Sequence, residues 1–246
     1  MSCSLSLSCL TSVGASAFGA ESIIAHEKTK FLIEESGMQD WGSEFGRMPR
    51  LFREPDGIPG LTYPDIVFNE RIEIPLGGER GSLILEHCGR GHNAGNIVAW
   101  LPKHKILFAG DLVEAAAALY TGDAFHFDWS SGTLDRVKAY QADILVGGRD
   151  AVAKGRDKVD AAIEQTRGFL NGMIEKVGEV HRNGGTLKQA FDETHTLLAP
   201  KFGMWPIFEH CLPFDMKSLW DEFDGTDWPQ IWTAEKDQEV WDQLQN

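Results

Sequence analysis

This chain has few cysteines and lacks long apolar runs. Its four cysteines, Cys3, Cys9, Cys88 and Cys211, form no Cys-x-x-Cys motif and no spacing typical of a disulfide framework. We therefore expect free thiols. No stretch reaches the ~18 consecutive apolar residues that a membrane-spanning helix needs, so the sequence excludes a transmembrane helix.

Basic residues are scarce as well. The 23 lysines and arginines stand against 37 aspartates and glutamates, which gives a formal net charge of −14. Such a surface repels the phosphate backbone of nucleic acids and anionic lipids. We therefore expect a small-molecule substrate rather than nucleic acid or a membrane, and we disfavour a metal-dependent nuclease unless a local basic groove exists. Nothing in the sequence selects an oligomeric state.

The amino terminus also lacks basic residues. Residues 1–20 have a weakly apolar middle followed by small residues, as a signal peptide does, but the first basic residue is Lys28. A secretory signal begins with a positively charged region, and that region is missing here. We therefore expect the protein in the cytoplasm.

Short apolar runs separated by turn residues dominate the first part of the chain. They predict strands at 21–25, 65–68, 72–75, 82–86, 97–101, 106–109 and 144–146. Helical spacing appears at 27–35 and 134–140, and we expect a loop or short helices over 36–63. With 246 residues, of which 42% are hydrophobic, the chain is long enough for one large globular domain.

After residue 149 the pattern becomes helical. Apolar residues recur at steps of three and four from Val159 to Val180, which predicts a long amphipathic helix ended by Asn183-Gly184-Gly185. A second helix is expected over Leu187–Leu198, capped by Thr186, with Pro200 beyond its end. We expect the aromatic rings of the tail to pack helices onto the strands. Strands first and helices later predict an α/β (α+β layered) fold.

A histidine and an aspartate flank the clearest hairpin of the chain. His92 lies in a glycine-rich turn, and Asp111 ends an apolar run nineteen residues later. The two strands between them place both side chains at the same end of the hairpin. An imidazole and a carboxylate brought together there can form half of a metal site. The alternatives are a structural role for His92 and a helix cap by Asp111 for a helix over 112–119.

These motifs resemble those of the metallo-β-lactamase superfamily. The segments that carry the resemblance are Gly91–Asn96 (GHNAGN), Trp100–Pro102 (WLP) and Leu107–Asp111 (LFAGD). Within that superfamily, the chain is most similar to the quinoprotein relay system zinc metallohydrolases. Further segments similar to that group are Arg50–Arg53, Tyr120–Asp123 and Ile207–Asp215, while Ser22–Glu27 resembles the segment just after the first metal motif of the superfamily. The likeness extends from about Gly14 to the carboxyl end.

The resemblance implies an αββα sandwich with one or two zinc ions at one edge, and a glyoxalase-II-like chemistry. Zinc lowers the pKa of a bound water molecule and polarises a carbonyl, so hydrolysis of an ester or thioester is expected. His92 would be a zinc ligand, and Asp111 would ligate or bridge the metal ions.

The first departure from the superfamily lies at the amino terminus. The superfamily places a His-x-His motif before the small-residue helix, but no histidine precedes His26 in this chain. Cys9 is a conceivable ligand, yet one thiol does not replace two or three imidazoles. We interpret residues 1–13 as an atypical leader from a truncated or mis-started frame. Residues 14–246 then form the domain, with an α/β core over 14–150 and a helical part over 151–246.

The second departure is Arg149, which stands where most of the superfamily has a final ligand histidine. A guanidinium has no lone pair for a metal, so Arg149 would instead bind a substrate carboxylate or form an internal ion pair. His210, a polar residue in an apolar stretch, would complete the metal site or be a satisfied structural histidine. Asp123 is a candidate for substrate binding, and His126 and Asp128 are weaker candidates at the same edge.

Three functions follow for testing. The first is a zinc-dependent hydrolase that uses His92 and Asp111, with help from His210. The second is a catalytically impaired or inactive homologue whose metal site is incomplete, because the amino-terminal histidine pair is absent. The third is a partner-binding module built on the aromatic tail, which would expose a large apolar patch.

Overall fold

The computed structural model describes residues 2–3, 15–47, 49, 54, 57–149, 151–228 and 230–245. Of the expected leader over 1–13, only Ser2 and Cys3 belong to this set, and they form a two-residue strand. Cys9 and the Arg50–Arg53 motif lie outside the described residues. Cys88 and Cys211 are buried free thiols, as predicted.

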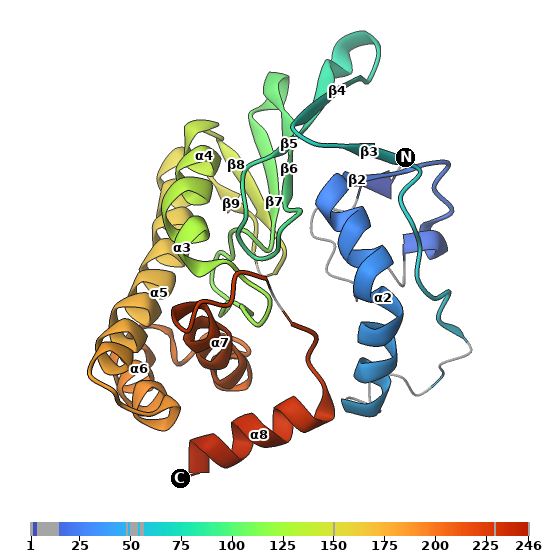
Figure 1. Ribbon diagram of the computed structural model, residues 1–246. Coiled ribbons are helices and arrows are strands. Elements are labelled where there is room, and N and C mark those ends of the chain that lie inside the picture. Colours follow the sequence, from blue (N-terminus) through green and yellow to red (C-terminus); the bar gives the residue numbers. More distant parts are fainter. Residues whose placement is uncertain are drawn as a thin grey trace.

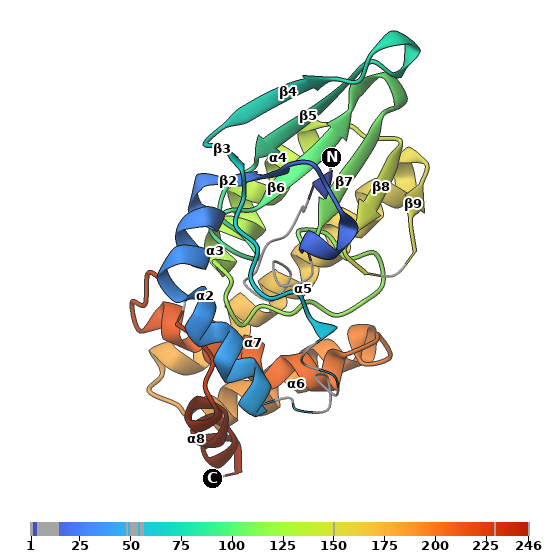
Figure 2. The same ribbon diagram turned by 90° about the vertical axis from the view of Figure 1, so that its right-hand side faces the viewer.

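Nine strands form two sheets in the described part of the chain. The smaller sheet is parallel and has the order β1 (Ser2–Cys3), β2 (Ile23–His26), β3 (Ile66–Phe68). The larger sheet has the order β4 (Arg71–Pro75), β5 (Ser82–His87), β6 (Ile97–Leu101), β7 (Ile106–Gly110), β8 (Ile144–Gly147), β9 (Ala153–Lys154). Figure 2 shows these six strands side by side in that order. Only the β7–β8 pair is parallel within it, so the chain leaves β7 and β8 at the same edge.

The helices lie on both sides of the sheets. On one side is α2 (Glu27–Arg47), and on the other are the short α3 (His126–Asp128), α4 (Leu134–Ala139) and the long α5 (Arg156–Arg182) (Figure 1). The carboxyl-terminal helices are α6 (Leu187–Phe202), α7 (Phe208–Phe223) and α8 (Ala234–Gln245). Short 3-10 turns cover Ala15–Phe18, Gly78–Arg80 and Pro102–His104, and a π-helical turn covers Trp129–Thr133.

Alternation along the strands explains the layers. On β6 and β7, Val98 and Leu107 enter the core shared with the helices, whereas their neighbours Ala99 and Phe108 face the small sheet. Successive side chains of a strand point to opposite faces, so both faces of the large sheet are covered. The result is the expected αββα sandwich with a helical carboxyl-terminal part.

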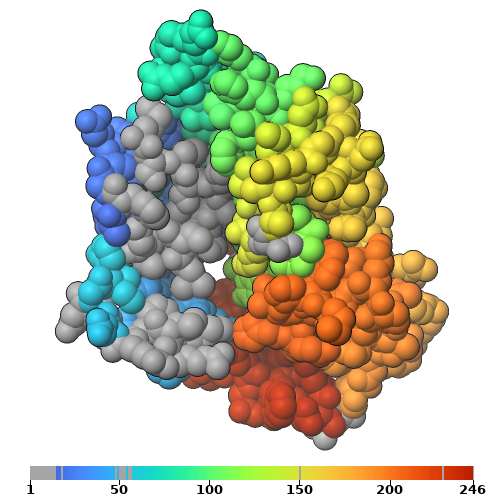
Figure 3. Space-filling model, turned by 180° about the vertical axis from the view of Figure 1, so that it is seen from behind, coloured from blue at the N-terminus to red at the C-terminus, as the bar shows by residue number. Residues whose placement is uncertain are grey.

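The carboxyl-terminal helices complete the larger core. Phe169 of α5 packs edge-on against Phe202 and Phe208, at centroid distances of 5.2 and 6.3 Å. The aromatic rings therefore join helices to one another as well as to the sheet. Residues from both predicted parts, 14–150 and 151–246, share this core, and the boundary between them stays a prediction. Seen from behind, orange α6 lies at the lower right and red α8 at the bottom of the molecule (Figure 3).

Two sequence predictions about helix length are wrong. Residues 36–47, expected as a loop or short helices, continue α2, because Gly37 and Glu44 lie on its buried side together with Ile33. Pro200, expected beyond its helix, lies inside the last turn of α6. A proline so near the end of a helix removes few internal hydrogen bonds, so the helix tolerates it. The predicted cap is confirmed, since the Thr186 side chain accepts a hydrogen bond from the Gln189 N–H.

Among the described residues, no helix is both long enough and apolar enough to span a membrane. This finding agrees with the absence of long apolar runs in the sequence.

Candidate metal-binding edge

The glycine-rich turn before β6 fixes the position of His92. The Asn93 side chain accepts a hydrogen bond from the Gly95 N–H at 2.8 Å, and the Asn96 amide donates to the Asn93 carbonyl at 2.6 Å. A Cβ at Gly95 would lie 2.1 Å from the Thr29 hydroxyl of α2, so this turn needs a glycine where it meets the helix. The turn is therefore held by hydrogen bonds of the Asn93 and Asn96 side chains and by close packing against helix α2.

The hairpin brings His92 and Asp111 together, as its spacing predicts. The His92 Nε2 and Asp111 Oδ2 atoms lie 3.8 Å apart. The helix-cap interpretation of Asp111 is wrong, because residues 112–119 form a turn, a bend and irregular chain rather than a helix. Asp111 instead lies at the carboxyl end of β7, directly after Gly110.

His92 is a buried, neutral imidazole. It is only 6% exposed, and its ring meets Trp129 edge-on at 6.0 Å and Tyr120 at 6.5 Å. Burial lowers its pKa, the negative charge of Asp111 acts in the opposite direction, and Arg149 lowers it further. A neutral imidazole keeps a lone pair at neutral pH, as a metal ligand or a proton acceptor requires.

Arg149 follows the neighbouring strand β8 and forms an internal ion pair. Its backbone N–H donates to Glu114 Oε2 at 2.8 Å, and its Nη1 donates to Glu114 Oε1 at 2.7 Å. Nη1 also lies 3.6 Å from Asp111 Oδ1. The ion-pair alternative for Arg149 is therefore observed. Its side chain is 38% exposed, which leaves the guanidinium accessible from outside.

Glu114 is a site residue that the sequence did not reveal. Its side chain is fully buried, and burial raises its pKa to about 8, with the Asp111 charge acting in the same direction and Arg149 opposing both. A glutamate in an otherwise apolar Leu-Val-Glu-Ala stretch was the only available signal. A buried acid needs a partner, and here the partner is the arginine found at the next strand end.

His210 does not join the His92–Asp111 pair. It lies exposed on α7, where it lines a groove of about 640 Å³ with residues of α2 and α8, including Arg47 and Trp241. Its ring meets Phe214 at 5.7 Å. The structure thus places His210 in a groove that neither His92 nor Asp111 lines, and its role as a ligand stays a prediction.

Asp123 belongs to a second polar cluster beside α2 and α8. Burial raises its pKa to about 7, Asp40 acts in the same direction, and Lys236 and Arg47 oppose them. Nearby, Arg47 pairs with Glu44 on its own helix and with Asp237 on α8. The charges that act most strongly on Asp123 thus come from the two outer helices, and its substrate-binding role stays a prediction.

The two weaker candidates have structural partners. His126 is fully buried, and its Nε2 and Nδ1 lie 2.8 Å from Thr121 Oγ1 and Glu222 Oε2. Asp128 accepts a hydrogen bond from Arg90 Nε at 2.6 Å. His126 thereby ties the loop after β7 to helix α7, and we assign neither residue to the candidate site.

The donor set fits a metal ion in part. Two ligands bound at ~2 Å to one tetrahedral zinc ion lie about 3.3 Å apart, so the His92 and Asp111 atoms, at 3.8 Å, would have to approach slightly to share an ion. The described ranges contain no cluster of three or more His, Cys, Asp or Glu side chains placed so that together they could hold a metal ion. The described residues therefore supply an imidazole and a carboxylate, which is half of a tetrahedral set.

The sequence is similar to a family of known proteins. The model of the family described as the metallo-beta-lactamase superfamily matches residues 14–149. A metallo-beta-lactamase type 2 of Bacteroides fragilis is 36% identical over 125 residues, which cover 49% of this chain and 47% of that protein. The metallo-beta-lactamase IND-1 of Chryseobacterium indologenes is 32% identical over 94 residues, covering 36% of this chain and 38% of its own.

Among solved structures, the metallo-beta-lactamase from Pontibacter korlensis aligns with a TM-score of 0.45 at 22% identity, over 62% of this chain and 61% of that one. The DIM-1 metallo-beta-lactamase aligns with a TM-score of 0.45 at 21% identity, over 65% and 62%. This chain spans less than half the length of the curated relatives named above. The family model nevertheless covers more than half of the chain, including the glycine-rich turn, the hairpin and both strand ends. The chain therefore belongs to the metallo-beta-lactamase superfamily.

Proposed function

We propose that this protein is a zinc-dependent hydrolase acting on an ester or thioester of a small molecule. The observation that carries the proposal is the His92–Asp111 pair, 3.8 Å apart at the carboxyl end of β7. A nitrogen and an oxygen donor of this kind suit zinc, and the superfamily membership supports the same metal. When bound, zinc would supply an acidified water molecule and a Lewis acid for the carbonyl group.

The residues of the chain have distinct tasks in this proposal. Burial keeps His92 neutral, so that it can bind zinc without first losing a proton. The Asp111 carboxylate supplies the second donor. The Arg149 guanidinium is accessible from outside, so a carboxylate on the substrate can approach it while Glu114 holds its inner side.

The competing proposal is a catalytically impaired relative. It is favoured by one observation, namely that the described residues supply only two converging donors. It also agrees with the departure noted in the sequence analysis, where no histidine stands ahead of His26 in these 246 residues. Loss of two nitrogen ligands would weaken zinc binding strongly. Two further expectations stay predictions: the cytoplasmic location, and the similarity of the sequence to the quinoprotein relay group.

Metal content separates the two proposals. The full chain is purified without added zinc, dialysed, and its zinc content per chain is measured by mass spectrometry. The matched control is His104→Ala, because His104 is exposed in the turn at the other end of the same hairpin. Stoichiometric zinc that is lost in His92→Ala and kept in His104→Ala supports the metal site. Absence of zinc in the unmodified chain contradicts it.

Activity is measured on the same preparations. A panel of small aryl esters and thioesters is offered with and without added zinc. We expect hydrolysis by the zinc-loaded protein and a loss of at least ~100-fold in His92→Ala, because removal of a ligand should cost no less than the ~10–100-fold loss caused by removal of a group that only orients a ligand. Bound zinc without hydrolysis of any panel member would favour the impaired relative.

A further inference from the structure

One face of α7 carries two acids that contact the loop after β7. Asp215 and Glu222 lie seven residues apart, about two helical turns, so their side chains leave the helix in nearly the same direction. The loop presents Thr121 and His126 to them. The Thr121 N–H donates to Asp215 Oδ1 at 2.6 Å, and the His126 N–H donates to Glu222 Oε2 at 3.0 Å. Each acid therefore holds one backbone N–H of the loop.

The side chains of the loop join the two acids into one row. The His126 Nδ1 lies 2.8 Å from Glu222 Oε2, and its Nε2 lies 2.8 Å from Thr121 Oγ1. Because a carboxylate only accepts hydrogen bonds, Nδ1 carries the proton of the neutral ring and the Thr121 hydroxyl donates to Nε2. A hydrogen bond with the Thr121 side chain also acts on the Asp215 carboxyl. We call these four side chains, from Asp215 to Glu222, the polar row.

The two ends of the polar row differ in their access to water. Asp215 is fully buried, and its Oδ2 has no hydrogen-bond partner in the described part of the chain. A buried carboxylate with a bare oxygen is costly, so this group holds a proton. Burial accordingly raises the pKa of Asp215 to about 8, although Thr121 and Arg149 oppose the rise. Glu222 is 18% exposed and lines a pocket of about 340 Å³.

Other charged and titratable groups face the polar row. Burial raises the pKa of Tyr120 and of Cys211, and the Asp215 charge acts in the same direction on both. Both therefore stay neutral near pH 8, where Asp215 titrates. Arg149 stays protonated throughout. The pocket beside Glu222 adds charged side chains that pair with one another, namely Arg90, Asp128, Asp221, Asp227 and Lys236.

A hydroxyl, an imidazole and a carboxylate in this order also match the arrangement that activates a nucleophile. Thr121 is fully buried, however, so no substrate reaches its hydroxyl. A proton needs no such space, because it passes along hydrogen bonds that already exist, and histidine is the side chain best suited to pass it on. The geometry therefore favours proton transfer over covalent catalysis.

We propose that Asp215 is a buried proton-binding site whose proton travels to and from the pocket along the polar row. For outward transfer, Asp215 gives its proton to the Thr121 oxygen while the Thr121 hydroxyl proton moves to His126 Nε2. The Nδ1 proton then moves to Glu222, which releases it into the pocket. Only O–H and N–H bonds form and break, and one proton leaves in total. The reverse order carries a proton inward. The proposal needs no metal ion and goes beyond the proposed hydrolase.

The experiment is time-resolved infrared spectroscopy of the full chain without added metal. The carbonyl band of protonated Asp215 is the part of the spectrum that Asp215→Asn removes, which separates it from the other acids with a raised pKa, Glu114 and Asp123. Protons released by a light flash from a caged acid, starting above pH 8, show how fast this band appears. We expect Thr121→Val to slow its appearance at least ~10-fold, because the proton then enters only when this region opens locally.

Two controls bracket this variant. Thr121→Ser keeps the hydroxyl and should keep the rate of the unmodified protein. Thr166→Val removes a hydroxyl from a threonine of α5 that is equally buried but has no hydrogen-bond partner in the described part of the chain, and it should also keep the rate. His126→Phe should slow proton uptake as Thr121→Val does, and it tests the polar row if Thr121→Val does not fold. Circular dichroism confirms that each variant is folded.

Three results would overturn the proposal. Absence of the band below pH 8 would mean that Asp215 is ionised in the folded chain. Equal rates in Thr121→Val and in the unmodified protein would mean that the proton takes another path. Faster uptake in Thr121→Val would mean that the Thr121 hydroxyl only closes the loop against water, which is a structural role. Since every measurement is made without metal, each result leaves the test of the hydrolase unaffected.

Discussion

The two faces of the six-stranded sheet carry cores of very different size. On the helical face, a continuous core joins the strands to α4, α5, α6 and α7 and includes fully buried Trp129 and Phe169. On the other face, the buried core between the two sheets consists, among the described residues, of Ile24, Leu85 and Ala99, with partly exposed neighbours around them. The helical face therefore provides most of the hydrophobic stabilisation in the described part of the chain.

This difference bears on the candidate metal-binding edge. Leu112 and Val113, which follow Asp111, belong to the large core, and Trp129 of the same core packs against His92. The described half of the site is thus built on the strongly packed side.

The largest effect is expected for Phe169→Ala in the large core. Removal of a fully buried phenylalanine ring from a closely packed core leaves a cavity and costs about 3–5 kcal/mol of unfolding free energy. Urea denaturation followed by circular dichroism measures it. Phe169→Leu, which keeps most of the apolar contact, should lose less than half as much. A loss below about 2 kcal/mol for Phe169→Ala would show that the two cores do not differ as the packing indicates.

The corresponding change in the small core is Leu85→Ala. Leu85 is fully buried, but its neighbours Ile72, Ile74 and Leu83 are partly exposed and can settle into the space. We therefore expect a cost near the low end of the range for leucine truncation, about 2–3 kcal/mol. Urea denaturation followed by circular dichroism measures this cost as well. A cost above that of Phe169→Ala would reverse the comparison.

The junction between the large core and the site is tested by Trp129→Phe. The indole Nε1 donates a hydrogen bond to the Leu112 carbonyl at 3.1 Å, directly after Asp111. Phenylalanine keeps an aromatic ring beside His92 but leaves that buried carbonyl without this donor, which costs about 1–3 kcal/mol. We expect weaker zinc binding as well, measured by competition with a chelator. Unchanged affinity together with lost stability would mean that the bond serves only the fold.

The small core between the two sheets also contains the groups that should make stability fall at low pH. His26 of β2 and His87 of β5 stack at a centroid distance of 4.0 Å, and burial lowers the pKa of both, that of His87 to about 4. Between the unfolded pKa of ~6.5 and the folded value, the unfolded chain binds protons that the folded chain does not. The stability that the neutral pair contributes is therefore present above pH ~6.5 and is lost as the pH falls toward 4.

Melting temperatures at pH 7 and pH 5 measure this effect. We expect the fall between them to be smaller in His87→Gln than in the unmodified protein, because glutamine does not titrate. His104→Gln, at an exposed position, should leave the fall unchanged. Equal falls in His87→Gln and in the unmodified protein would mean that other groups set the acid sensitivity.

The sequence predicted the parts of this fold that follow local periodicity. Short apolar runs bounded by turn residues predicted β5 to β7, and the three-and-four spacing that follows from one buried helix face predicted α5; both predictions are confirmed. The proximity of His92 and Asp111 followed from the length of their hairpin. The pairing of Arg149 with Glu114 did not, because it depends on two loops meeting across the β7–β8 edge. The exposed position of His210 depends likewise on how α7 packs against the other helices, and the sequence of α7 alone does not show this.

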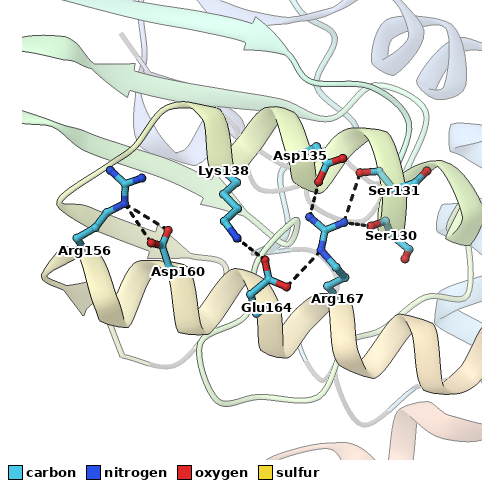
Figure 4. Close-up of polar contacts among 8 residues, drawn as sticks. All are labelled: Ser130, Ser131, Asp135, Lys138, Arg156, Asp160, Glu164 and Arg167. Atoms are coloured by element: carbon cyan, nitrogen blue, oxygen red, sulfur yellow. Dashed lines mark hydrogen bonds and ion pairs between the residues drawn. The ribbon is translucent and has the colours of Figure 1, made fainter.

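The smallest effect is expected on the outer surface of the strongly packed side, where charged residues join α4 to α5 (Figure 4). Lys138 pairs with Glu164 at 2.7 Å, but both side chains are more than 40% exposed. Solvent screens such a pair, so Lys138→Ala should cost at most about 0.5 kcal/mol. Arg167 is only 18% exposed and also binds Asp135 and the Ser130 carbonyl, so Arg167→Ala should cost clearly more. If Lys138→Ala approached Leu85→Ala in the same urea titration, surface charge rather than the depth of the core would account for the stability of the helical face.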